Sequence, residues 1–351
     1  MKVKTKFGKK AEDIIDIKKN FIDENSKLFK WQKKLFKHYL KQPIRKKCKN
    51  CGKKLDGQYF EKISVKYILC KTCGHLNGLN QDTLKLAKLF YQSNNGEEYS
   101  KYYISKKNIR LDYKNRVNKI YDPKAKFLIN SLPSEKNNYH YVDIGCGSGH
   151  FVSSLKKMKI TNIEGHDPSK TMINFGNKIN NFNKLNFISM DELGIFLKKL
   201  KSKKPIVISM IGVFEHIYDN RSILKIIKSN KNIKYFFISV PCYSLSTFIE
   251  IVFDKYFQRL MAPQHTHAYS YKSLKYMEKE FDFKIISEWW FGTDIIDFWR
   301  SFYVNIANKK SKQNNSLNMF NQFLKPIMDD LQLVIDKNKK SSEAHIVFKI
   351  N

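Results

Sequence analysis

Four of the six cysteines stand in two matched pairs that could hold one metal ion. Two residues separate Cys48 from Cys51 and Cys70 from Cys73, and eighteen residues lie between the pairs. This spacing is typical of a structural zinc site, because two intervening residues let both thiolates of a pair face a single tetrahedral ion. Four thiolates fill the coordination shell, so the sequence predicts a structural Zn²⁺ without an open catalytic position. A redox role for one pair is the alternative, and two matched pairs disfavour it.

A glycine-rich loop could bring a ligand against bare backbone N–H groups. Residues 139–144 read as a buried strand, the loop 145–149 follows, and a helical segment comes next. Residues 162–167 read as a second strand that ends at Asp167, where a carboxylate can accept both ribose hydroxyls of a nucleoside. The loop reads G-x-G-x-G, and His150 stands where a dinucleotide-binding fingerprint needs its third glycine. The pattern therefore predicts a nucleoside site that is not built for a pyrophosphate.

The rest of the chain supplies the elements that must position these residues. Further apolar runs predict strands within 186–191, 205–217, 234–241, 283–288 and 344–350. Helical patterns occupy 11–40, 81–125, 271–281 and 300–340. We therefore expect a helical segment at 1–42, a zinc-binding module at 43–80, a helical linker at 81–125, and an α/β core at 126–351 with a helical insertion at about 300–340.

The segment from Val142 to Gly149 resembles motif I of the class I S-adenosylmethionine-dependent methyltransferases. The resemblance covers roughly 125–351, with tight motifs only at 141–151 and 205–217. It implies a Rossmann-like α/β fold with a seven-stranded sheet, preceded here by a small zinc ribbon and a helical linker, and S-adenosylmethionine as cofactor. The cofactor-binding residues that it implies are Asp143, Gly145, Cys146, Gly147, Gly149, Asp167 and Asp191. The Cys146 side chain is expected only to pack, and Glu192 could serve in place of Asp191.

Glu215 and His216 follow the fourth predicted strand of this core and are the first candidates for catalysis. His216 is a candidate base, since an imidazole titrates near neutral pH. Alternatively, Glu215 and His216 cap the following helix or contact the cofactor. His265 and His267 are alternate residues of one loop, so on an extended segment both could reach the acceptor, although packing at a helix entry is the plainer explanation.

A four-Cys module before a class I core, with Glu-His after strand four, is similar to bacterial methyltransferases of deoxysugar and surface-polysaccharide pathways. This resemblance implies methylation of a sugar, or of a nucleotide- or lipid-linked sugar intermediate, at oxygen or carbon. The sugar C-methyltransferases carry a further domain after the core, so O-methylation is at least as well supported. Tyr102 and Tyr103 are candidates for the acceptor pocket. Trp289, Trp290 and Trp299 could stack on a sugar, but are better explained as core.

Two other functions fit parts of the sequence. The formal net charge is +33, and residues 1–80 hold 22 Lys and Arg against 7 Asp and Glu. An RNA methyltransferase could hold nucleic acid with this basic module. Against it, the Asn/Asp-Pro-Pro-aromatic motif of amino-methylating enzymes is missing after strand four. A non-catalytic cofactor-binding scaffold is the second alternative, and the intact glycine loop disfavours it.

Composition sets the remaining bounds. With 59 Lys and only 6 Arg among 351 residues, and with many Asn, Ile, Phe and Tyr, the charge is explained at least in part by A/T-rich codons. Where the charge is densest it fits an anionic, sugar-type acceptor. No run of 18 apolar residues and no signal peptide is found, and six cysteines are too few for a disulfide scaffold. These features predict a cytoplasmic protein without a membrane span.

Overall fold

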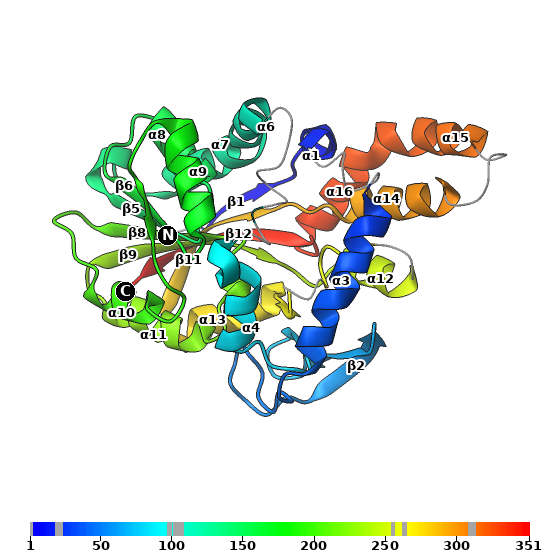
Figure 1. The fold of residues 1–351 in the computed structure, drawn as a ribbon, viewed down its shortest axis with the longest axis horizontal. Coiled ribbons are helices and arrows are strands. Elements are labelled where there is room, and N and C mark those ends of the chain that lie inside the picture. The colour runs from blue at the N-terminus through cyan, green and yellow to red at the C-terminus, as the bar shows by residue number, and fades with distance from the viewer. Residues whose placement is uncertain are drawn as a thin grey trace.

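The computed structural model describes residues 3–17, 24–96, 100, 109–253, 257–261, 265–307 and 314–351. Its centre is a mixed eight-stranded sheet with helices on both faces (Figure 1). In spatial order the strands are β1 (Lys4–Phe7), β11 (Phe283–Trp290), β12 (Glu343–Ile350), β9 (Ile233–Pro241), β8 (Ile206–Ile211), β5 (His140–Ile144), β6 (Ile163–Asp167) and β7 (Leu185–Phe187).

All strands of the large sheet are parallel except β12, which is antiparallel to both β9 and β11. The central strands are almost wholly apolar, as a sheet covered on both faces requires. In β9 only Lys234 is exposed. From β5 the chain builds outward to β6 and β7, then returns to place β8 on the other side of β5. Ligands of such sheets bind at the carboxyl ends of the strands beside this switch point.

Two hydrophobic cores lie on opposite faces of the sheet. One face is covered by α7 (Asp122–Ser131), α8 (His150–Lys157) and α9 (Lys170–Asn180), and the other by α10 (Leu193–Lys199), α11 (Asn220–Ser229) and α13 (Tyr271–Glu280) (Figure 1). Adjacent residues of β9 divide between them, because successive side chains of a strand point to opposite faces. Phe236 packs in the core with α11 and α13, and Phe237 in the core with α7 and α8.

A smaller four-stranded sheet carries the cysteine pairs. Its strands are β2 (Gly57–Lys62), β3 (Val65–Cys70), β4 (Leu76–Gly78) and β10 (His267–Ala268). The segment between the two pairs forms the antiparallel hairpin β2–β3. Strand β10 comes from the core half of the chain and pairs with β4, so backbone hydrogen bonds tie this sheet to the large domain.

The remaining helices lie around the sheets. They are α1 (Ala11–Ile17), α3 (Asn25–Leu40), α4 (Leu84–Tyr91), α6 (Ile109–Arg116), α12 (Leu245–Val252), α14 (Asp294–Ala307), α15 (Asn314–Leu324) and α16 (Met328–Lys337), with single turns at Ser93–Gly96, Val117–Tyr121, Lys136–Asn138, Phe214–His216 and Lys325–Ile327. The insertion expected at about 300–340 is therefore helical, and it begins at Asp294. Helix α1 packs against it, with Ala11 and Ile14 beside Ile295 and Met328.

The prediction of seven strands is wrong by one. The seven strands expected at 139–350 are all present, but Lys4–Phe7 adds β1 beside β11, in a segment for which only helices were predicted. Three of its four residues are exposed, and its sequence lacks the alternation that marks a half-buried strand. Pairing with a strand about 280 residues away in sequence defines it, and Thr5 Oγ1 donates to Glu288 Oε1 across the pair.

Candidate functional site

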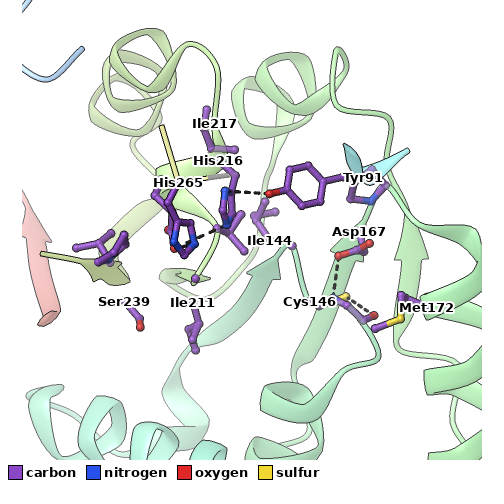
Figure 2. A pocket seen from close by; sticks show the side chains of 18 of the residues that line it. Tyr91, Ile144, Cys146, Asp167, Met172, Ile211, His216, Ile217, Ser239 and His265 are labelled. Atoms are coloured by element: carbon purple, nitrogen blue, oxygen red, sulfur yellow. Dashed lines mark hydrogen bonds and ion pairs between the residues drawn. The ribbon is translucent and has the colours of Figure 1, made fainter. Parts of the chain in front are cut away.

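One cavity of about 880 Å³ opens at the carboxyl ends of β5, β6, β8 and β9. It collects residues far apart in sequence, from Lys9 near the N-terminus to Glu343 at the start of β12. Figure 2 shows Asp167 and Cys146 on one side of this space and His216 and His265 on the other, with Tyr91 directed toward His216. The cavity lies at the position that the strand order predicts for a ligand.

The loop after β5 adopts backbone angles that favour glycine. Gly145, Gly147 and Gly149 all have positive φ, and all three line or flank the cavity. At Gly145, where φ is +69°, a Cβ atom would lie 2.4 Å from Cγ2 of Val213 in the turn after β8. The loop therefore passes so close to the β8 turn that only glycine fits there.

We expect Gly145→Ala to weaken both folding and cofactor binding. A left-handed backbone costs a non-glycine residue about 1–3 kcal/mol, and the clash with Val213 adds to it. Thermal unfolding and cofactor titration would measure the two effects. Gly194→Ala in α10 is the control for stability, since Gly194 lies in a helix and its Cβ would meet only Ile226 Cδ1 at 3.4 Å. Equal melting temperatures for the two variants would contradict the prediction.

Asp167 ends β6 inside the cavity and contacts the glycine loop. Its Oδ2 accepts a hydrogen bond from Gly147 N and its Oδ1 one from Ser169 N, both at 2.8 Å. Burial raises the pKa of this carboxyl to about 6, against the two backbone hydrogen bonds, which lower it. The acid predicted at the end of the second strand is therefore placed where a ligand of the loop would meet it.

Asp143 and Cys146 have packing roles in this structure. Asp143 is buried beneath the loop, where Ser209 Oγ donates to its Oδ1 at 2.6 Å, and burial raises its pKa to about 7. It does not line the cavity among the described residues. Cys146 does line it, and a Cβ at Gly165 would lie 2.8 Å from its sulfur, so the side chain packs on β6 as expected.

Asp191 lies on the rim of the cavity, half-exposed. Its Oδ1 forms an ion pair with Lys88 Nζ at 3.0 Å, and the Ser189 hydroxyl donates to the same carboxylate. The Ser189 hydrogen bond, followed by Lys88, lowers the pKa of Asp191 to about 2. The other candidate, Glu192, does not line the cavity among the described residues.

Glu215, His216 and His265 meet at the cavity wall. Glu215 Oε1 lies 3.9 Å from Nε2 of each histidine, and the two imidazole rings stack with centroids 5.0 Å apart. His216 Nδ1 is 3.1 Å from the Tyr91 hydroxyl, and His265 Nδ1 is 2.9 Å from the carbonyl oxygen of Arg259. Burial raises the pKa of Glu215 to about 8 and lowers that of His265 to about 4. We call these three residues the Glu-His-His cluster.

His267 is not among the three residues of this cluster, and its burial fits the packing that the sequence offered as the plainer explanation. Its side chain is 1% exposed, and its Nδ1 lies 2.9 Å from Nε2 of His75, between the small sheet and the core. His75, as expected, is a neighbour of the cysteines.

The four cysteines converge at one point. Cys48 Sγ lies 3.6 Å from Cys73 Sγ, and Cys51 Sγ lies 3.8 Å from Cys70 Sγ. All four sulfur atoms are within 4.8 Å of one another, and all four side chains are buried. Sulfur atoms that each lie about 2.3 Å from one ion are about 3.8 Å apart in a regular tetrahedron. Asn77 Nδ2 also donates to Cys48 Sγ at 3.4 Å. The cluster therefore fits a zinc ion.

Several cavity residues carry no local signal in the sequence. Tyr91, which contacts His216, is one of many tyrosines in the predicted helical linker. Trp31 of α3 also lines the cavity. The tryptophans considered for sugar stacking are buried in the cores instead: Trp289, Trp290 and Trp299. An aromatic residue next to a lysine-rich helix face is too common a pattern to have marked them. Tyr102 and Tyr103 lie outside the described residues.

The fold and the cavity together define a class of enzyme, the class I S-adenosylmethionine-dependent methyltransferases, as the motifs predict. The family model described as "Methyltransferase domain" matches residues 113–288, half of the chain, and the chain belongs to this family.

Solved structures of methyltransferases are similar to the chain at low identity. The methyltransferase domain of a bacterial Hen1 protein is 13% identical with a TM-score of 0.41, covering 66% of this chain and 99% of its own. A methyltransferase from Archaeoglobus fulgidus is 19% identical (TM-score 0.41, 68% and 97%). Geranyl diphosphate C-methyltransferase from Streptomyces coelicolor A3(2) is 10% identical (TM-score 0.43, 76% and 97%). No curated protein matches the chain.

None of the described helices is both long and apolar enough to span a membrane.

Proposed function

We propose that this enzyme methylates a sugar, or a nucleotide- or lipid-linked sugar intermediate of glycan biosynthesis, at an oxygen or carbon atom. The observation that carries the proposal is the Glu-His-His cluster on the wall of the cofactor cavity. Its two imidazoles and one carboxylate suit an acceptor whose reacting group is a hydroxyl, or a carbon next to a carbonyl, and must lose a proton.

S-adenosylmethionine supplies an electrophilic methyl group on a sulfonium. We assign its binding to the loop Gly145–Gly149 and to Asp167, whose carboxylate would accept the ribose hydroxyls. We assign the adenine end to Asp191 on the rim, and to Asp143 a supporting role, since its hydrogen bond from Ser209 joins β5 to β8 next to the loop.

We assign proton removal from the acceptor to His216, with Glu215 and His265 orienting the acceptor beside it. The Tyr91 hydroxyl at His216 Nδ1 fixes the plane of the imidazole ring, and the Arg259 carbonyl does the same for His265. Their Nε2 atoms therefore turn toward the Glu215 carboxyl and the cavity.

The cavity also supports an anionic acceptor. Lys9 lines it beside Lys124, and burial together with the positive charge of Lys124 lowers the pKa of Lys9 to about 8. Lys124 Nζ is already paired with Glu343 Oε1 at 3.0 Å, so a negatively charged group bound here would be stabilised chiefly by Lys9. Phosphate of a nucleotide- or lipid-linked sugar would provide such a charge.

We further propose that the four-Cys cluster holds a structural Zn²⁺ and that the protein is cytoplasmic. Support for the location comes from the cysteines, none of which forms a disulfide. Support for the zinc comes from the converging sulfurs and from β10, through which a folded cysteine module would brace the segment that carries His265.

Transfer of labelled methyl from S-adenosylmethionine to panels of nucleoside-diphosphate sugars, free sugars and RNA tests the acceptor. We expect a sugar acceptor, and we expect His216→Ala to lower kcat about 100-fold or more while cofactor affinity stays within a factor of three, since general-base catalysis contributes about 10²–10⁴-fold. His38→Ala, at an exposed helix position, is the control and should leave kcat unchanged. Methylation of RNA alone, with binding that weakens steeply as salt rises, would replace this proposal by the RNA methyltransferase alternative.

A further inference from the structure

We propose that the Glu-His-His cluster is a binding site for a divalent transition-metal cation, separate from the four-Cys cluster. The ligand atoms of Glu215, His216 and His265 all lie within 4.8 Å of one another. Glu215 Oε1 is 3.9 Å from both Nε2 atoms. Three atoms that each bind one ion at about 2.1 Å lie about 3.0–3.6 Å apart, so the carboxylate and each imidazole must approach by about 0.3–0.9 Å to share an ion.

The surroundings of the two histidines are those of metal ligands. Each has its Nδ1 held by an oxygen atom, the Tyr91 hydroxyl for His216 and the Arg259 carbonyl for His265. For His265 the contact to a carbonyl requires that Nδ1 carry the proton, which leaves Nε2 with a lone pair toward Glu215. Oxygen partners at the distal nitrogen are the usual second layer around metal-bound histidines, because they fix the tautomer and the ring plane.

Glu215 provides the second, independent observation. Its side chain is 3% exposed, and its Oε2 atom has no hydrogen-bond partner among the described residues. A buried carboxylate oxygen without a donor is costly in a folded protein, and a bound cation removes that cost. The 3.9 Å separations are too long for hydrogen bonds, so the histidines do not satisfy this carboxylate by themselves.

The ligand set and its position indicate what the cation would do. Two imidazoles and one carboxylate suit Mn²⁺, Fe²⁺, Co²⁺ or Zn²⁺, and three protein ligands leave coordination positions open. All three residues line the cavity, so the open positions face the place where the acceptor must bind. This role rests on the proposed function: a bound cation would polarise an oxygen atom of the acceptor and so promote the loss of its proton, in place of His216 as base.

Mn²⁺ is the probe of choice, because it favours oxygen and nitrogen ligands and does not compete for a four-thiolate site. The zinc-loaded protein is titrated with Mn²⁺, and binding is measured as the loss of the electron paramagnetic resonance signal of free Mn²⁺. We expect one site per chain. Glu215→Gln, which keeps the side-chain volume, and His265→Ala should each weaken Mn²⁺ binding at least tenfold. His38→Ala should bind like the wild type.

Tyr91→Phe serves as a second variant that leaves all three ligands in place. Loss of an oxygen partner from a metal-bound histidine weakens metal binding about 10–100-fold, and a purely structural tyrosine would not change it. Absence of a Mn²⁺ site, or an affinity equal to that of the wild type in both Glu215→Gln and Tyr91→Phe, overturns the inference even if sugars are methylated. A Mn²⁺ site in a protein that methylates no sugar leaves the inference standing and rejects the proposed acceptor.

Discussion

Cys73→Ser is expected to abolish zinc binding at the four-Cys cluster and to unfold the cysteine module. The four buried sulfur atoms surround one point. Among the described residues, the group that could hold an ion there consists of these four thiols. Zinc binding contributes about 10–16 kcal/mol in small zinc modules, far more than the hydrophobic contacts of so small a sheet can replace. Wild-type protein should carry one zinc per chain, and the variant less than a tenth of that by elemental analysis.

Unfolding of the cysteine module should also disturb the position of His265 in the active site. Strand β10 pairs with β4 and begins two residues beyond His265, so the loop that carries His265 loses its anchor when the small sheet unfolds. We expect early proteolysis at 43–80 and a lower melting temperature. Cys242→Ala is the matched control, because Cys242 is a buried cysteine outside the cluster. The Cys242→Ala protein should therefore keep its zinc. Freshly purified wild-type protein without stoichiometric metal would refute the assignment.

Asp167→Ala is expected to weaken S-adenosylmethionine binding about 100-fold or more. Hydrogen bonds to a charged acceptor contribute about 1.5–3 kcal/mol each, and two ribose hydroxyls would lose theirs. Isothermal titration measures the affinity, with Asp330→Ala as the control because Asp330 is exposed on α16. Unchanged affinity in Asp167→Ala would show that the cofactor is assigned to the wrong residues.

The same carboxyl predicts a pH dependence. Burial raises the pKa of Asp167 to about 6, so the group is ionised at pH 8 and protonated at pH 5, and cofactor affinity should fall as the pH drops through 6. Facing it are Asp143, whose pKa of about 7 is also raised by burial, and the Cys146 thiol, which burial keeps protonated. Asp167→Asn should flatten the profile below pH 6. A profile identical to that of the wild type would assign the titration to Asp143 instead.

The sequence by itself determined the parts of this protein that depend on local geometry. Each of these patterns is set within a few residues: two residues between cysteines, glycines at positions of positive φ, a strand that ends in Asp167, and an apolar run that leads to Glu215. They predicted the cysteine cluster, the methyltransferase class, and seven strands of the sheet, and the structure and the family match confirm these. The zinc ion, the acceptor and the catalytic assignments stay predictions.

Only the tertiary structure decided which distant segments meet. Tyr91 reaches His216 across 125 residues, β1 pairs with β11 near the other end of the chain, and His265 joins Glu215 while His267 turns to His75. Such contacts follow from how helices and sheets pack over the whole core, and no local pattern encodes them. The Glu-His-His cluster arises in this way, because the adjacent residues Glu215 and His216 gain His265 as a neighbour only when the segment before β10 folds against the end of β8.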